Sequence, residues 1–137
     1  MSSPTLFQNI AGDPLNFWRG QALNLRKVRD FANLSNKDIS RMAGVAPTSV
    51  RFDDKVPVEV LEHMENIANV CNLVFEFFQD DVKTKLWLQT PNPLLGNTSP
   101  KDMIRVGRYK KLLQFVTDAL REGAVTHGEA PQEKARA

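Results

Sequence analysis

Residues 58–78 read VEVLEHMENIANVCNLVFEFF and carry the longest helical pattern in the chain. Their apolar side chains recur at steps of three and four residues, which is the spacing of one face of an α-helix. These side chains are Leu61, Met64, Ile67, Ala68, Cys71, Val74, Phe75 and Phe78. Glutamates and asparagines occupy the other faces. The segment is therefore predicted to form a central core helix.

Helical patterns also flank this segment on both sides. Leu25, Val28, Phe31 and Ala32 share one stripe, and Ser35 with Asp38 has the spacing of a capping box. Further helix starts are predicted at Asp13-Pro14, after Asp80-Asp81 and at Ser99-Pro100, and Gly123 is placed at the end of the last helix. Alternating strand patterns bounded by hairpin turns are missing from the sequence. The predicted fold class is all-α, a helical bundle.

Composition excludes several classes of protein. The chain has 137 residues, of which 42% are apolar and 25% charged, as in an ordinary soluble globular protein. With the single cysteine Cys71 no intrachain disulfide can form, and the two histidines, His63 and His127, leave almost nothing for a metal centre. No apolar run approaches the roughly 18 residues needed to cross a bilayer, and the first residues lack a signal-peptide pattern. We expect a cytoplasmic protein without metal or cofactor.

Enzyme chemistry is not expected either. The glycines form no phosphate-cradling motif, and His127 has no companion that could act with it. Asp80 and Asp81 are adjacent, so on a helix they would point about 100° apart, which suits a helix cap better than acid–base catalysis. We therefore predict a non-enzymatic protein with no small-molecule substrate of its own.

The net charge of +2 hides three blocks of opposite sign. Residues 19–51 hold seven basic and two acidic side chains, residues 52–81 hold one basic and eight acidic, and residues 82–121 hold eight basic and two acidic. Such alternation is typical of surfaces that meet different partners, although solvated helix faces would give the same pattern.

Residues 35–52, SNKDISRMAGVAPTSVRF, resemble a helix-turn-helix. The first helix would run to about Ala43, Gly44 would form the turn, and Pro47 would lie early in the second helix. Phosphate or base contacts would then come from Lys37, Arg41, Thr48, Ser49 and Arg51. The alternative is a purely structural unit of three helices, since Asp53 and Asp54 would repel phosphate.

Residues 86–120, LWLQTPNPLLGNTSPKDMIRVGRYKKLLQFVTDAL, hold the most specific motif. Pro91 and Pro93 restrict the backbone, so that Leu94 and Leu95 are set on a stiff loop. Arg105, Arg108 and Lys111 follow at three-residue steps and would share one side of the last two helices. These features predict a protein-docking surface, with burial of the leucines in the core as the alternative. For Trp87, burial in the core is the favoured interpretation.

This motif closely resembles the toxin-binding domain of the Xre/MbcA/ParS-type antitoxins. The matching residues are Trp87, Thr90, Pro91, Asn92, Pro93, Leu95, Gly96, Ser99, Pro100, Asp102, Ile104, Gly107, Arg108, Leu112, Ala119 and Leu120. Asn97 stands where the family often has a second glycine. Residues 38–57 also resemble the Xre-like N-terminal region of this family, and the likeness extends over roughly residues 20–122.

The resemblance implies an antitoxin of a type II toxin–antitoxin system. Its partner would be a RES-domain toxin that consumes NAD or transfers ADP-ribose, and whose active site the antitoxin obstructs. Asn92, Leu94, Leu95, Arg105, Arg108 and Lys111 are the candidate toxin-binding residues. A homodimer that represses its own operon by binding operator DNA is also implied. The alternatives are a stand-alone helix-turn-helix transcriptional regulator and an adaptor without a toxin.

The predicted organisation has four parts. Residues 1–13 would be a flexible N-terminus, 14–79 a helix-turn-helix-like region with the long core helix, 80–122 the toxin-binding module and 123–137 a flexible tail. The tail would either add contacts near the entrance of the toxin's active site or play no part in binding.

Overall fold

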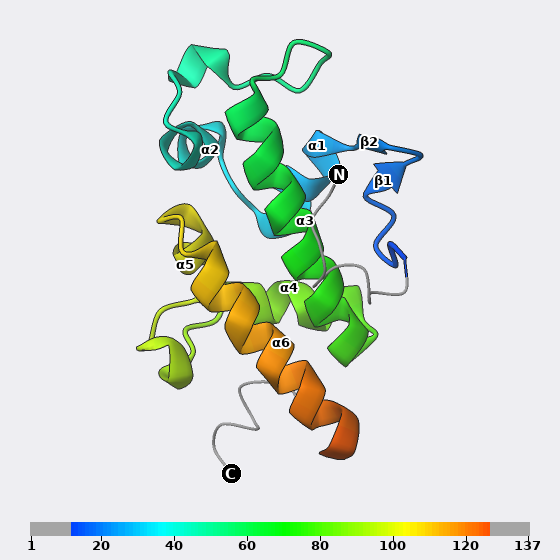
Figure 1. The fold of residues 1–137 in the computed structure, drawn as a ribbon. Coiled ribbons are helices and arrows are strands. Elements are labelled where there is room, and N and C mark those ends of the chain that lie inside the picture. Colours follow the sequence, from blue (N-terminus) through cyan, green and yellow to red (C-terminus); the bar gives the residue numbers. More distant parts are fainter. Residues whose placement is uncertain (1–11, 127–137) are drawn as a thin grey trace.

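The computed structural model describes residues 12–126 (Figure 1). Most of the two ends predicted to be flexible, residues 1–11 and 127–137, lies outside the described residues. The elements are β1 (Trp18–Arg19), β2 (Ala22–Leu23), α1 (Leu25–Ala32), α2 (Asn36–Ala43), η2 (Pro47–Ser49), α3 (Val58–Phe78), α4 (Asp81–Gln89), η3 (Pro93–Leu95), α5 (Pro100–Arg105) and α6 (Tyr109–Thr126). The all-α prediction is thus confirmed, with one short hairpin added.

Helix α3 forms the centre of the bundle, as predicted, and its bounds match the predicted ones. Helices α1, α2, α4 and α6 all pack against it (Figure 1). Because neighbours cover α3 on several sides, its buried set extends beyond one stripe and includes Val60, Val70 and Leu73. Leu61 and Phe78, which belong to the predicted stripe, are only partly buried.

One hydrophobic core serves the whole described chain. Val28 and Ile39 enter it from the N-terminal region, and Trp87 and Leu112 enter it from the region predicted to bind a partner. Each of these four side chains is at most 2% exposed. Removing the C-terminal helices would therefore uncover the buried face of α3.

The polar caps of α2 and α5 form largely as the sequence predicts. The Ser35 hydroxyl accepts from the Asp38 N–H, and the Asp38 carboxylate accepts from the Ser35 N–H, which completes the capping box. Ser99 caps α5 by accepting from the Asp102 N–H. At the end of α2, Gly44 adopts φ 69°, a left-handed conformation that glycine reaches without strain.

The helix predicted to start at Asp13-Pro14 does not form. The chain instead makes a turn and then the antiparallel hairpin β1–β2, in which Trp18 pairs with Leu23. Asp13 belongs to the predicted flexible N-terminus, yet its carboxylate accepts from the Trp18 N–H at 2.7 Å and from Asn72 Nδ2 at 2.9 Å. Asn72 Oδ1 in turn accepts from the Leu15 N–H at 3.1 Å, so α3 fixes this turn in place.

The second helix of the predicted helix-turn-helix is also wrong. Residues Pro47–Ser49 form a single 3-10 turn, and Val50 returns to extended backbone. A 3-10 turn of three residues is too short to lie along a DNA groove as a recognition helix does.

At the other end of the chain, α6 passes the predicted stop at Gly123 and ends at Thr126. None of the helices in the described part is both long and apolar enough to cross a membrane.

Candidate functional site

The loop between α4 and α5 is closed by its own hydrogen bonds. The Asn92 N–H donates to the Thr98 carbonyl at 3.1 Å, and the Asn97 N–H donates to the Asn92 carbonyl at 2.9 Å. The Asn92 side chain accepts from the Leu94 N–H at 2.9 Å and caps η3. Asn92 is 2% exposed, so the side chain of this predicted docking residue shapes the loop from within.

Leu94 and Leu95 take different positions on this loop. Leu94 is 49% exposed, which is unusual for a large apolar side chain. Leu95 is partly buried and packs against the core. Leu95 therefore contributes to the core, and the exposed Leu94 stays a predicted docking residue.

A surface hollow of about 510 Å³ lies beside the loop. Its lining comes from η3, α5, the start of α6 and the loops beside them: Leu94, Leu95, Gly96, Thr98, Asp102, Met103, Val106, Arg108 and Lys111. We call it the apolar hollow, because Leu94, Leu95, Met103 and Val106 supply its hydrophobic wall. Four of the six predicted toxin-binding residues line it.

Three cations lie close together in the chain next to the apolar hollow, and two of them line it. Arg108, Lys110 and Lys111, here called the basic ridge, are exposed. Together with Asn66, Gly107 and Tyr109 they line a second hollow of about 570 Å³, and Arg108 and Lys111 line both. Among the described residues none of the three forms an ion pair.

Lys110 and Val106 are surface residues that the sequence reasoning missed. Arg105, Arg108 and Lys111 were expected to share one side of the last two helices, but α5 ends at Arg105 and α6 begins only at Tyr109. Gly107 with φ 79° breaks the helix between them and changes the direction of the following side chains.

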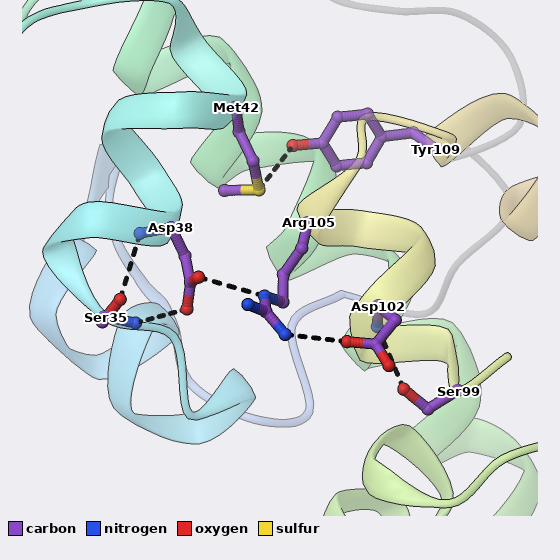
Figure 2. Close-up of polar contacts among 7 residues, drawn as sticks. All are labelled: Ser35, Asp38, Met42, Ser99, Asp102, Arg105 and Tyr109. Carbon is purple, nitrogen blue, oxygen red and sulfur yellow. Dashed lines mark hydrogen bonds and ion pairs between the residues drawn. The ribbon is translucent and has the colours of Figure 1, made fainter.

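Arg105 does not belong to the basic ridge and pairs with two carboxylates (Figure 2). Its Nε donates to Asp38 Oδ1 at 3.0 Å and its Nη1 to Asp102 Oδ1 at 2.9 Å. Burial acts to raise the pKa of Asp38, but hydrogen bonds from Ser35 and the Arg105 charge outweigh it, so the pKa lies below its usual value. This predicted docking residue therefore ties α5 to α2.

A second contact joins α2, α3 and α6 nearby. The Tyr109 hydroxyl donates to Met42 Sδ at 3.8 Å (Figure 2) and lies 2.6 Å from His63 Nδ1. Which atom donates in this short contact, the hydroxyl or Nδ1, depends on the tautomer of the imidazole. Burial lowers the pKa of His63, while the charge of Glu62 opposes that shift.

We expect the protein to lose stability as the pH falls below about 6.5, the ordinary pKa of histidine. The folded state holds His63 neutral, so the unfolded chain binds its proton more readily, and acid favours unfolding. Neutral His63 contributes to the free energy of unfolding above about pH 6.5, and this contribution is lost as the pH falls through the pKa of His63 in the folded state. Urea unfolding at pH 7.5 and 5.5 should show a smaller pH effect in His63→Gln than in the original protein. An equal effect in both would contradict the role of His63.

The predicted DNA-binding residues do not form one cationic surface on a recognition helix. Lys37 and Arg41 are exposed on α2, and Thr48 and Ser49 lie on η2. Arg51 forks onto Asp53, with Nε–Oδ1 at 2.8 Å and Nη2–Oδ2 at 2.5 Å. That fork lowers the pKa of Asp53 to about 2 and occupies the donors that would read guanine.

Two other expectations concern buried side chains. Trp87 is 2% exposed and stacks on Phe115, so its place in the core is confirmed. Cys71 is fully buried, and burial raises the pKa of its thiol to about 12. Within residues 12–126, His, Cys, Asp and Glu side chains do not gather in a group of three that could hold a metal ion.

Comparison with known proteins finds a family model that covers the loop and all the residues lining the apolar hollow except Lys111. Residues 73–110 match the family model described as the antitoxin Xre/MbcA/ParS C-terminal toxin-binding domain. The mycobacterial cidal antitoxins MbcA of Mycobacterium bovis and Mycobacterium tuberculosis are 26% identical over 101 residues, covering 74% of this chain and 81% of theirs. A solved structure titled as the M. tuberculosis MbcT–MbcA toxin–antitoxin complex aligns with a TM-score of 0.48 and 21% identity, over 72% of this chain and 91% of that one. The predicted resemblance is confirmed: residues 73–110 match the model of the C-terminal toxin-binding domain of the Xre/MbcA/ParS antitoxins.

Proposed function

We propose that this protein is the antitoxin of a type II toxin–antitoxin pair and that it binds its cognate toxin through the apolar hollow and the basic ridge. The observation that carries the proposal is the position of this surface. Leu94, Val106 and Arg108 are exposed on the segment that matches the toxin-binding domain model. The relatives that are 26% identical bear the name antitoxin, which supports the same role.

The partner we propose is a RES-type toxin that consumes NAD or transfers ADP-ribose. This part rests on the resemblance of the motif around Asn92 and Arg108 to the Xre/MbcA/ParS antitoxins. The antitoxin would act by occupying the entrance of the toxin's active site. Such inhibition needs a rigid binding surface and no catalytic group on the antitoxin itself.

The surface has the composition of a protein interface. Exposed apolar side chains at Leu94 and Val106 lie next to Arg108, and this mixture of apolar and arginine contacts is typical of the centre of an interface. The closed loop holds Leu94 in one place, so a partner meets a defined shape.

The test is rescue of cells that produce the toxin encoded next to this chain, with intracellular NAD as the readout. The original protein should preserve NAD, and the double variant Leu94→Asp/Val106→Asp should fail, because two carboxylates would be buried at the contact. Val82→Asp/Leu86→Asp is the matched control. These residues are 70% and 64% exposed on α4 and line neither hollow, so rescue should persist.

Point variants suit this test better than truncation. A chain cut before Thr90 would lose α5 and α6, and α6 packs along α3 in the common core. Failure of such a chain would report unfolding. The proposal is wrong if the original protein neither binds the neighbouring toxin nor preserves NAD, or if the Leu94/Val106 variant rescues as well as the control.

Operator binding, autorepression and a homodimer stay predictions from the sequence. The 3-10 turn at Pro47–Ser49 and the Arg51–Asp53 pair supply no recognition helix for DNA. Nothing in the described residues favours the stand-alone regulator over the antitoxin.

A further inference from the structure

We infer that the toxin segment received by this surface carries an apolar side chain with carboxylates beside it, the apolar group entering the apolar hollow and the carboxylates pairing with the basic ridge. The inference rests on the proposed function and adds the chemistry of the partner. It combines two observations. One is the hydrophobic wall of the apolar hollow, and the other is the set of unpaired cations in the basic ridge beside it.

The apolar half of the recognition comes from the exposed wall of the hollow. Val106 is 68% exposed and Leu94 is 49% exposed, while Met103 beneath them is buried at 3%. Covering such a wall removes apolar surface from water, which stabilises a complex by about 25 cal/mol per Å² before the costs of binding. A leucine-sized or phenylalanine-sized side chain suits a hollow of about 510 Å³ that is open on one side.

The charged half of the recognition follows from which cations already have a carboxylate partner and which do not. Arg105 is neutralised by Asp38 and Asp102, and Arg51 by Asp53. Arg108, Lys110 and Lys111 have no such partner among the described residues. Three unpaired cations beside an apolar wall favour a partner that supplies carboxylates, because opposite charges across an interface speed and orient docking.

The same surface fits a nucleic acid less well. Leu94 and Val106 would gain no apolar contact from a phosphate backbone, which is bound chiefly through charge. The observations therefore favour an acidic, partly apolar protein segment.

Zero-length crosslinking of the purified toxin–antitoxin complex tests the charged half. A carbodiimide joins a lysine amine to a carboxylate only when the two are in direct contact. Amide bonds from Lys110 or Lys111 to an acidic toxin residue are expected in the peptide mass spectra, with an apolar toxin residue close to that acid in the sequence. Lys83 and Lys85 on α4 serve as internal controls. Crosslinks to the toxin from α4 alone would overturn the inference.

A charge-reversal pair tests the same contact by affinity. Arg108→Glu/Lys111→Glu should raise the Kd for the toxin at least tenfold and weaken its dependence on salt. Arg19→Glu/Lys83→Glu makes the same change of net charge outside both hollows, and its Kd should stay within about threefold of the original value.

The outcomes separate this inference from the proposed function. If the original protein forms no complex with the toxin, the proposed function fails. If the complex forms and Arg108→Glu/Lys111→Glu binds as tightly as the control pair, the inference alone is wrong. It is equally wrong if that pair abolishes retention of duplex DNA at low salt while toxin affinity is unchanged, because the ridge would then serve a nucleic acid.

Discussion

Trp87→Ala is expected to lower the free energy of unfolding by about 3–5 kcal/mol, the range for deleting a large aromatic side chain from a core. Trp87 lies on α4 at 2% exposure, and its ring stacks on Phe115 of α6 with centroids 6.5 Å apart and planes 9° apart. Its removal would leave a cavity where α4 meets α6. Urea unfolding followed by circular dichroism gives the free energy directly.

Two variants on the same helix control this prediction. Trp87→Phe keeps an aromatic ring in the core and should cost less than Trp87→Ala. Val82→Ala removes a side chain that is 70% exposed and should change the free energy of unfolding by less than about 0.5 kcal/mol. A loss below about 1 kcal/mol for Trp87→Ala would show that the tryptophan does not hold α4 to α6.

Asn72→Leu should lower the free energy of unfolding by about 2 kcal/mol, although leucine is apolar and similar in size. Asn72 is 1% exposed, and its amide bridges the Asp13 carboxylate and the Leu15 N–H. The leucine would leave the Leu15 N–H unpaired and place an apolar group against a carboxylate. Denaturant unfolding measures the loss, and limited proteolysis should find the turn before β1 more accessible.

Asn69→Leu is the matched control for this change. Asn69 lies one turn earlier on α3, is partly exposed and makes no hydrogen bond with its side chain among the described residues. Its substitution should leave stability within about 0.5 kcal/mol. Equal losses in the two variants would mean that α3 tolerates leucine poorly in general, and that the bridge to Asp13 is unimportant.

The elements predicted best from the sequence are those with strong local signals. The apolar spacing of 58–78 predicted α3 with its bounds, and the Ser35–Asp38 box predicted the start of α2. The hairpin was missed because strands of two residues are too short to show alternation. Asp13 was interpreted as a helix cap because its true partner, Asn72, is 59 residues away in the sequence.

The candidate site was predictable in composition but not in geometry. The stiff proline loop and the basic side chains near Arg108 were visible in the sequence. Which cations remain unpaired depends on tertiary contacts, and the ion pair of Arg105 with Asp38 spans 67 residues. The predicted recognition helix failed for a related reason, since Pro47 suits the first position of a 3-10 turn as well as that of an α-helix.

The hydrogen bonds that close the loop from Asn92 to Thr98 bear on the thermodynamics of docking. Ordering a flexible backbone costs about 1–2 kcal/mol per residue in lost conformational entropy. A loop that already has its bound shape avoids that cost when a partner arrives, and more of the contact energy appears as affinity. Replacing Asn92 by glycine should therefore increase the entropic cost of association, even though the Asn92 side chain is buried.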